Sequence, residues 1–157
     1  MAVIALRPVE DGDLDALFDQ MRDPQSVWMA AFTADDPDDR KAFDAHMAGV
    51  RISPEITLRA ITCDGVLVGS LASFVIGGQT EVTYWIERAF WGRGIASLAL
   101  RLLIDLVPAR PLYARAASDN AGSLRVLKKA GFQAVGTEHS FAPARKTEIK
   151  ETILRKD

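Results

Sequence analysis

The sequence predicts a single domain of the mixed α+β class over residues 1–157. A chain of 157 residues with 48% hydrophobic residues can bury one core, and no linker or repeat divides it. Strand-like runs alternate with helical patterns in the order β-α-α-β-β-β-α-β-α-β-β. A glycine-rich segment at residues 91–97 separates a strand-like run from an apolar helical run, which is typical of a ligand-binding strand-to-helix turn.

The first predicted elements are a strand at residues 3–6 and a helix after it. Asp11 or Asp13 can cap this helix, and Pro24 is expected to end it, because proline cannot continue a helix. Its inward face is expected to carry Leu14, Leu17, Phe18 and Met21.

A second helix is predicted to begin at Asp36-Pro37 and to run to about residue 50. Aspartate is a preferred N-cap, and proline is favoured at the first helical position. Residues 27–32, between the two helices, are apolar without a clear period, so no regular element is predicted there.

The middle of the chain is predicted to form three strands joined by two tight turns. Asp64-Gly65 and Gly77-Gly78 are turn dipeptides of the kind that close two-residue hairpins. The strands they join are expected at residues 56–63, 66–76 and 81–86.

The C-terminal part is predicted to hold two helices and three strands. An apolar helix at residues 95–107 ends before Pro108, and a capped amphipathic helix begins after Asn120. The strands are expected at residues 112–117, 132–138 and 147–154.

The glycine-rich segment predicts an anion site. A glycine turn that opens a helix leaves several backbone N–H groups without partners at the positive end of the helix dipole, where phosphate binds well. Neither the Gly-Lys-Ser/Thr of a P-loop nor the G-x-G-x-x-G spacing is present. By itself, this segment is equally compatible with a plain strand-to-helix turn.

A second segment, Asn120 to Phe132, supports the ligand-binding interpretation. It matches N-x-x-S/A-x-x-V/L-x-x-K-x-G-F, and residues Trp91 to Ala96 match the pyrophosphate motif Q/R-x-x-G-x-G/A. In this order the two segments resemble the GNAT superfamily of N-acetyltransferases. Trp91 departs from the Gln or Arg that is usual at the start of the first motif. The phrases Leu6-Arg7-Pro8 and Tyr84-Trp85-Ile86 are similar to the Rim-type ribosomal-protein acetyltransferases.

The resemblance implies a fold and an activity. The GNAT fold has a central, mostly antiparallel sheet of about seven strands flanked by four helices, splayed between its fourth and fifth strands. The implied activity is direct transfer of acetyl from acetyl-CoA to a primary amine. A non-catalytic acyl-CoA-binding sensor on the same fold is the alternative.

The resemblance also implies which residues bind acetyl-CoA. Backbone N–H groups of the glycine-rich segment would hold the pyrophosphate, the strand before it would pair with the pantetheine arm, and two lysines could reach the 3′-phosphate. The expected residues are Trp85, Ile86, Trp91, Gly92, Arg93, Gly94, Ile95, Ala96, Ser97, Asn120, Ser123, Lys128 and Lys129.

Catalysis needs a proton acceptor for the amine and a proton donor for the departing thiolate. Glu81, at the start of the strand that leads to residues 91–97, is the candidate base, with Glu87 or a water chain as alternatives. Many family members use a tyrosine as the acid at the position of Leu127, which cannot donate a proton. Ser123 is therefore the candidate acid, unless it only completes the helix cap.

The acceptor site is predicted near Trp28, Met29 and Phe32, close to an acidic cluster. Residues 1–44 hold eleven acidic and four basic residues, which suits either a solvated face or a funnel for an amine. The expected acceptor is a small-molecule amine or a protein N-terminus.

No metal site, nucleic-acid partner or membrane partner is expected. The formal net charge is −2, no lysine or arginine block occurs, and one cysteine cannot form an internal disulfide. No signal segment is apparent, so a cytoplasmic location is expected, and a homodimer is left open.

Overall fold

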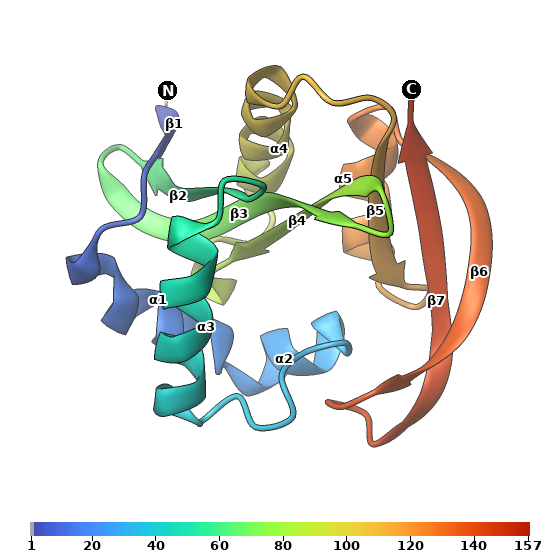
Figure 1. Cartoon of the computed structure of the whole chain (residues 1–157), viewed down its shortest axis with the longest axis horizontal. Coiled ribbons are helices and arrows are strands. Elements are labelled where there is room, and N and C mark those ends of the chain that lie inside the picture. The colour runs from blue at the N-terminus through green and yellow to red at the C-terminus, as the bar shows by residue number, and fades with distance from the viewer. Residues whose placement is uncertain (1) are drawn as a thin grey trace.

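A seven-stranded sheet runs through the molecule, with helices on both faces (Figure 1). The computed structural model describes residues 2–157. The strands are β1 (Ile4–Arg7), β2 (Thr57–Cys63), β3 (Val66–Ile76), β4 (Gln79–Ile86), β5 (Leu112–Ala117), β6 (Gln133–Ala142) and β7 (Thr147–Lys156). The helices are α1 (Leu14–Met21), α2 (Pro24–Ala30), α3 (Arg40–Ile52), α4 (Ile95–Leu106) and α5 (Ala121–Lys129), with short 3₁₀ helices η1 (Asp11–Asp13) and η2 (Arg88–Phe90).

The strand order is β1-β2-β3-β4-β5-β7-β6, and every pair except β4–β5 is antiparallel. The β2–β3 hairpin turns through Asp64 and Gly65, whose φ angles are 51° and 82°. Two successive positive φ angles match the twist of the flanking strands, so this turn sets the register that pairs Cys63 with Val66. The predicted two-residue turn is confirmed.

Strands β4 and β5 diverge soon after they meet. They pair only at Thr80 with Leu112 and at Glu81 with Tyr113. Beyond Glu81, the edge of β4 that faces β5 therefore has no strand partner. This is the predicted splay between the fourth and fifth strands.

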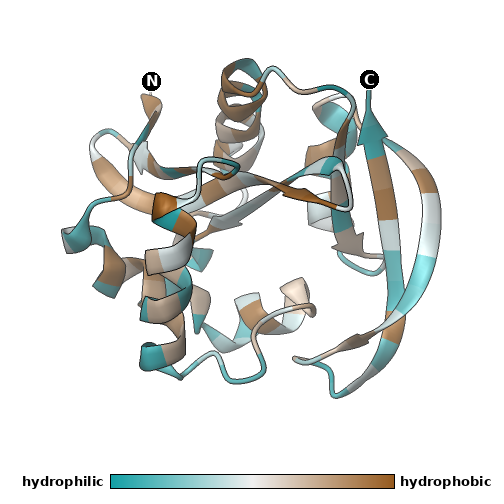
Figure 2. Cartoon of the chain, viewed as in Figure 1, coloured by the Kyte–Doolittle hydropathy of each residue, from teal (hydrophilic) through white to brown (hydrophobic). Residues whose placement is uncertain are grey.

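The two faces of the sheet are covered by different helices (Figure 1). Helices α4 and α5 pack on one face over the main core, and Figure 2 shows α4 as largely apolar. Helices α1, α2 and α3 lie on the other face. The main core includes the fully buried residues Ile61, Val68, Leu100, Leu103, Leu112 and Leu154.

Within residues 2–157 there are five α-helices, where the sequence predicted four. The additional helix, α2, begins at Pro24, which was expected to end a helix. The Asp23 side chain caps it by accepting bonds from the Ser26 N–H and hydroxyl, at 3.0 and 2.9 Å. Proline fits the first helical position because its missing N–H would have no partner there.

The start of α3 also differs from the prediction. Asp39, rather than Asp36, is the N-cap, and its carboxylate accepts the N–H of Ala42 at 3.0 Å. Asp36 closes a preceding turn instead, because its side chain accepts the N–H of Asp38 at 3.0 Å. The helix therefore begins at Arg40.

Within residues 2–157, no helix has both the length and the apolar character needed to cross a membrane.

Candidate active site

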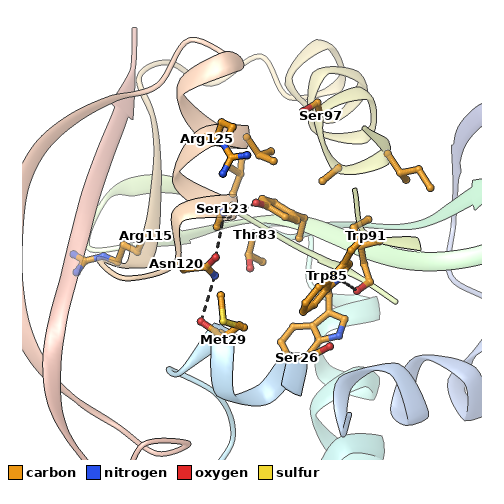
Figure 3. Close-up of a pocket in the computed structure, with 18 of the residues that line it drawn as sticks. Ser26, Met29, Thr83, Trp85, Trp91, Ser97, Arg115, Asn120, Ser123 and Arg125 are labelled. Atoms are coloured by element: carbon orange, nitrogen blue, oxygen red, sulfur yellow. Dashed lines mark hydrogen bonds between the residues drawn. The ribbon is translucent and has the colours of Figure 1, made fainter. Parts of the chain in front are cut away.

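A cavity of about 720 Å³ opens where β4 and β5 diverge. One end is lined by β4, by the segment before α4 and by the first turns of α4 and α5. The other end is lined by α2, the residues after it, and β3, β5 and β7. Figure 3 shows Ser97 and Trp91 at the first end, Arg115 at the second, and Asn120 and Ser123 between them.

The start of α4 has the properties of an anion site. Gly92 and Gly94 have φ angles of 77° and 76°, in the left-handed region that favours glycine. The first helical bond of α4 runs from Leu98 N–H to Gly94 C=O, so the N–H groups at 95–97 have no acceptor in the helix. A Cβ on either glycine would meet no atom within 4 Å, which leaves space for a pyrophosphate against the backbone.

Trp91, which departs from the usual motif, has a structural role here. Its indole N–H donates to the carbonyl of Ile86 at 2.9 Å, so the side chain folds back onto the end of β4. The Trp85 indole N–H donates to the carbonyl of Gln20 in α1 at 2.9 Å. Both rings are therefore fixed where β4 reaches the cavity.

The start of α5 is tied to α2 by Asn120. The Asn120 Oδ1 accepts the N–H of Ser123 at 3.2 Å, and its Nδ2 donates to the carbonyl of Met29 at 3.3 Å (Figure 3). The Ser123 Oγ makes its hydrogen bond with the hydroxyl of Tyr84, at 2.9 Å. Burial raises the pKa of Tyr84, although the bond to Ser123 opposes it, so this hydroxyl keeps its proton at neutral pH.

Glu81, the predicted base, lies at the point where β4 and β5 part. It is 8% exposed, and its Oε1 accepts a bond from the Nε of Arg115 at 3.2 Å. Arg115 also contacts Glu151 at 3.2 Å and Glu138 at 3.0 Å. Phe74, paired with Glu81 across β3 and β4, lines the same end of the cavity. Arg115 and its three carboxylates are called the Arg115 cluster below.

A second ion pair anchors the chain next to α2. Arg145, in the turn between β6 and β7, contacts Asp119 through both guanidinium NH groups, at 2.8 and 3.2 Å. Its Nε donates to the carbonyl of Trp28 at 2.8 Å, and its guanidinium lies 4.4 Å from the centre of the Trp28 ring. The bond from Arg145 lowers the pKa of Asp119, which keeps this carboxylate charged. Arg145, Asp119 and Trp28 are called the Arg145 clasp.

The cavity brings together most of the predicted site residues. Those that line it are Met29, Phe32, Glu81, Trp85, Ile86, Trp91, Gly92, Gly94, Ile95, Ala96, Ser97, Asn120 and Ser123.

Four other predicted residues lie outside its lining. Trp28 is 54% exposed and belongs to the Arg145 clasp. The Arg93 guanidinium stacks over the Phe90 ring, 5.1 Å from its centre. Lys128 and Lys129 are exposed in the last turn of α5. Their roles in binding stay predictions.

The sequence assigned no catalytic or binding role to several lining residues, among them Tyr84, which was expected to pack in the core, Arg115 and Glu151. Arg115 is the one charged residue in the strand LYARAA, and such an isolated charge was a usable signal. Glu151 gave no signal, because it lies in a strand rich in charged residues. Within residues 2–157, no group of three or more His, Cys, Asp or Glu side chains is arranged to hold a metal ion.

This chain is similar to known acetyltransferases in sequence and in fold. A family model described as an acetyltransferase (GNAT) domain matches residues 4–133. The chain is 29% identical over 115 residues to the N-alpha-acetyltransferase RimI of Mycobacterium tuberculosis, a match that covers 70% of each protein. It is 30% identical over 146 residues to mycothiol acetyltransferase of Clavibacter michiganensis, covering 77% of this chain but 47% of that protein. The structure of Mycobacterium smegmatis RimJ in complex with CoA-disulfide superposes with a TM-score of 0.82 at 21% identity, covering 97% of this chain and 80% of that one.

A mixed sheet that splays between β4 and β5, with a glycine-rich helix start beside the splay, is the arrangement predicted for a GNAT acyltransferase. The chain belongs to the GNAT acetyltransferase family, and its likeness to RimI confirms the predicted resemblance to the Rim-type branch. It is an acetyltransferase that uses acetyl-CoA as its acetyl donor.

Proposed function

We propose that this chain transfers acetyl from acetyl-CoA directly to a primary amine bound between α2 and Glu81. The acceptor is a protein N-terminal amine or a small cationic amine. One observation carries the proposal: a buried carboxylate, Glu81, lines the same cavity as the free N–H groups at the start of α4. Donor and acceptor can therefore meet at the divergence of β4 and β5.

The donor end of the cavity supplies binding groups. The N–H groups at 95–97 and the dipole of α4 favour the pyrophosphate. The edge of β4 beyond Glu81 lacks a strand partner toward β5, so its main chain can pair with the amide groups of the pantetheine arm. The thioester then lies between β4 and the start of α5.

The acceptor must lose two protons as the amide forms. An alkyl ammonium first gives one proton to a base, and the freed nitrogen lone pair attacks the thioester carbonyl carbon. The C–S bond then breaks, its electron pair stays on sulfur, and the second nitrogen proton is lost. The thiolate takes up one proton, so one proton in total is released to solvent.

Glu81 is the proposed base, with ordered water as the alternative route. A side cavity of about 50 Å³ is lined by the polar side chains of Thr83, Tyr84, Arg115 and Ser123. It is large and polar enough to hold water, which could relay a proton. The two routes are separated by Glu81→Gln, which abolishes the first and spares the second.

The hydroxyl pair of Tyr84 and Ser123 is the proposed proton donor to sulfur. Leu127, at the position where many relatives carry a tyrosine, is 2% exposed and packs in the main core. The Tyr84 hydroxyl reaches the cavity from β4 instead, so the role need not be vacant. This weighs against the alternative of a non-catalytic acyl-CoA sensor.

The acceptor class follows from the far end of the cavity. Met29, Phe32 and Phe74 provide apolar walls beside the Arg115 cluster, an arrangement that suits an amine carried on an apolar body. RimI is named for an N-alpha amine and mycothiol acetyltransferase for a small molecule, so relatives of both kinds occur.

The proposal is tested by thiol release from acetyl-CoA with a panel of small amines and N-terminal peptides. We expect turnover with at least one amine and no acceleration by alcohols or thiols. Glu81→Gln should lower kcat by about 10²-fold or more and leave the acetyl-CoA affinity unchanged. Tight acetyl-CoA binding without turnover on any amine would support the sensor instead.

A further inference from the structure

We propose that Glu151 is a second carboxylate of the acceptor site: it receives the ammonium together with Glu81, and the pair, rather than Glu81 alone, accepts the proton. The inference rests on the proposed function, because it places the acceptor amine at this end of the cavity. It assigns a catalytic role to a residue of β7, a strand that the sequence motifs do not include.

The geometry places Glu151 and Glu81 on one surface of the cavity. They come from β7 and β4, on either side of β5, and both line the cavity. Each is 8% exposed, and each accepts a bond from the Arg115 guanidinium at 3.2 Å. One guanidinium thus holds two buried carboxylates within reach of one ligand.

The charge of this pair matches an ammonium ion. Arg115 contacts both carboxylates, so these three side chains carry a net charge of −1; Arg125, the other charged residue of the lining, belongs to α5. Buried charge without full compensation is costly, so a cation that enters between the carboxylates is favoured. The free amine that remains after proton loss is held less strongly and can move to the thioester.

The groups that face Glu151 are few. Arg115 faces it from β5, Glu81 from β4 and Glu138 from β6, while α2 carries no titratable side chain. Burial raises the pKa of Glu151, although Arg115 opposes this effect, and the two other carboxylates raise it further. A carboxylate with a raised pKa is a better proton acceptor for an ammonium at neutral pH.

Glu151 is also positioned to receive the proton without a change in its own contacts. Arg115 occupies one of its oxygens, Oε1, so Oε2 is available to the ammonium. The proton moves from nitrogen to a carboxylate oxygen of the pair, Oε2 of Glu151 or an oxygen of Glu81, and the N–H electron pair becomes the lone pair that attacks the carbonyl carbon. The protonated carboxyl then returns the proton to solvent through the open cavity.

The test is the pH profile of kcat/KM for the amine in Glu151→Gln and Glu151→Asp. We expect Glu151→Gln to lower kcat/KM by about 10²-fold and to raise the KM for the amine. The acid limb, the low-pH side of the profile where kcat/KM falls as the base is protonated, should move to lower pH. The acetyl-CoA affinity should stay unchanged. Glu151→Asp keeps the carboxylate, so it should retain the acid limb and recover part of the rate.

Glu138→Gln is the matched control. Glu138 contacts the same guanidinium at 3.0 Å but does not line the cavity, so Glu138→Gln reports the effect of disturbing Arg115 alone and should lower kcat/KM by a much smaller factor than Glu151→Gln. Equal effects of Glu138→Gln and Glu151→Gln would overturn the inference, since both would then act only by disturbing Arg115. An unshifted acid limb in Glu151→Gln would also overturn it. If the unmodified protein acetylates no amine, the proposed function itself fails, and this inference fails with it.

Discussion

At the residue scale, the chemistry depends on side chains that reach the cavity from strands far apart in sequence. Tyr84 and Ser123 are 39 positions apart, yet their oxygens lie 2.9 Å from each other. The sequence indicated Ser123 as a candidate proton donor, and the structure adds Tyr84 as its hydrogen-bond partner. As a hydrogen-bonded pair they can pass a proton to sulfur, because the hydroxyl that donates its proton to sulfur takes up the proton of the other hydroxyl.

This pairing makes a prediction for three variants. Ser123→Ala and Tyr84→Phe should each lower kcat by about 10- to 100-fold, because thiolate is a fair leaving group and gains modestly from a donor. The acetyl-CoA affinity should change little. The double variant should be no slower than the worse single variant, since the two hydroxyls act as one unit. Independent, multiplying losses in steady-state kinetics would show that they do not.

Candidate catalytic residues were predictable from the sequence only where they stand beside a motif. Glu81 stands at the start of the strand that leads to the glycine-rich segment, and Ser123 lies inside the second motif. Glu151 lies 70 positions from Glu81, and they meet only because β7 pairs with β5. Strand order depends on long-range pairing, which no local pattern in the sequence encodes.

At the element scale, a glycine in the first turn of α5 lowers the stability of the helix and also lines the cavity. Gly122 lies in this helix, lines the cavity and has little around its missing Cβ, the nearest atom being Asn120 Oδ1 at 3.9 Å. Gly122→Ala should raise the free energy of unfolding by about 0.5–1 kcal/mol. It should also weaken acetyl-CoA binding, because the added methyl group enters the donor end of the cavity.

Gly49→Ala is the control for this prediction. Gly49 is exposed in α3, also has open space around its missing Cβ, and does not line the cavity. It should give the same stabilisation in thermal or chemical denaturation without any effect in calorimetry with acetyl-CoA. A loss of affinity in both variants would point to a cause other than contact with the donor.

The Arg145 clasp should position α2 for the acceptor. Arg145→Lys keeps the positive charge but loses the bidentate ion pair with Asp119 and the hydrogen bond to the Trp28 carbonyl. We expect a KM for the amine raised by about tenfold, with an unchanged Kd for acetyl-CoA. Arg155→Lys, which alters an exposed pair with Asp157, is the matched control and should behave as the unmodified protein. A rise in the Kd for acetyl-CoA instead would assign the clasp to the donor end.

Most elements were predictable because their signals are local. The β2–β3 turn follows from Asp64-Gly65, and α4 follows from an apolar run that opens after glycine. Helix α2 was missed because Pro24 is ambiguous: it can terminate one helix or begin another. The cap from Asp23 and the packing of Ala31 against Ala117 and Ala142 decide in favour of a new helix.

At the scale of the whole molecule, stability in acid should depend on an ion pair at the start of the chain. Asp13, 7% exposed, contacts both NH groups of Arg7, at 2.7 and 2.9 Å, and accepts the N–H of Glu10 at 2.8 Å. The bond from Arg7 lowers the pKa of Asp13, and the Glu10 N–H adds to this. A lowered folded-state pKa stabilises the fold above the unfolded value of about 3.9, and this stabilisation is lost as the pH falls through the folded value.

Asp13→Asn should therefore lower the free energy of unfolding near neutral pH by about 1–3 kcal/mol. Denaturant unfolding followed from pH 7 downward should show the two proteins converging below about pH 4. Asp15→Asn, which alters an exposed pair with Arg40, should have a smaller effect. A difference between Asp13→Asn and the unmodified protein that persists at low pH would assign the loss to packing.

In the proposed reaction, donor and acceptor occupy one cavity together and acetyl passes directly between them. Cys63, the one cysteine of the chain, does not line this cavity, so no thiol is placed to carry the acetyl group. The most direct measurement is the initial rate with acetyl-CoA and the acceptor amine both varied. Intersecting double-reciprocal lines, with no acetyl adduct on the protein by mass spectrometry, are the predicted result. Parallel lines together with an acetylated protein would contradict the account.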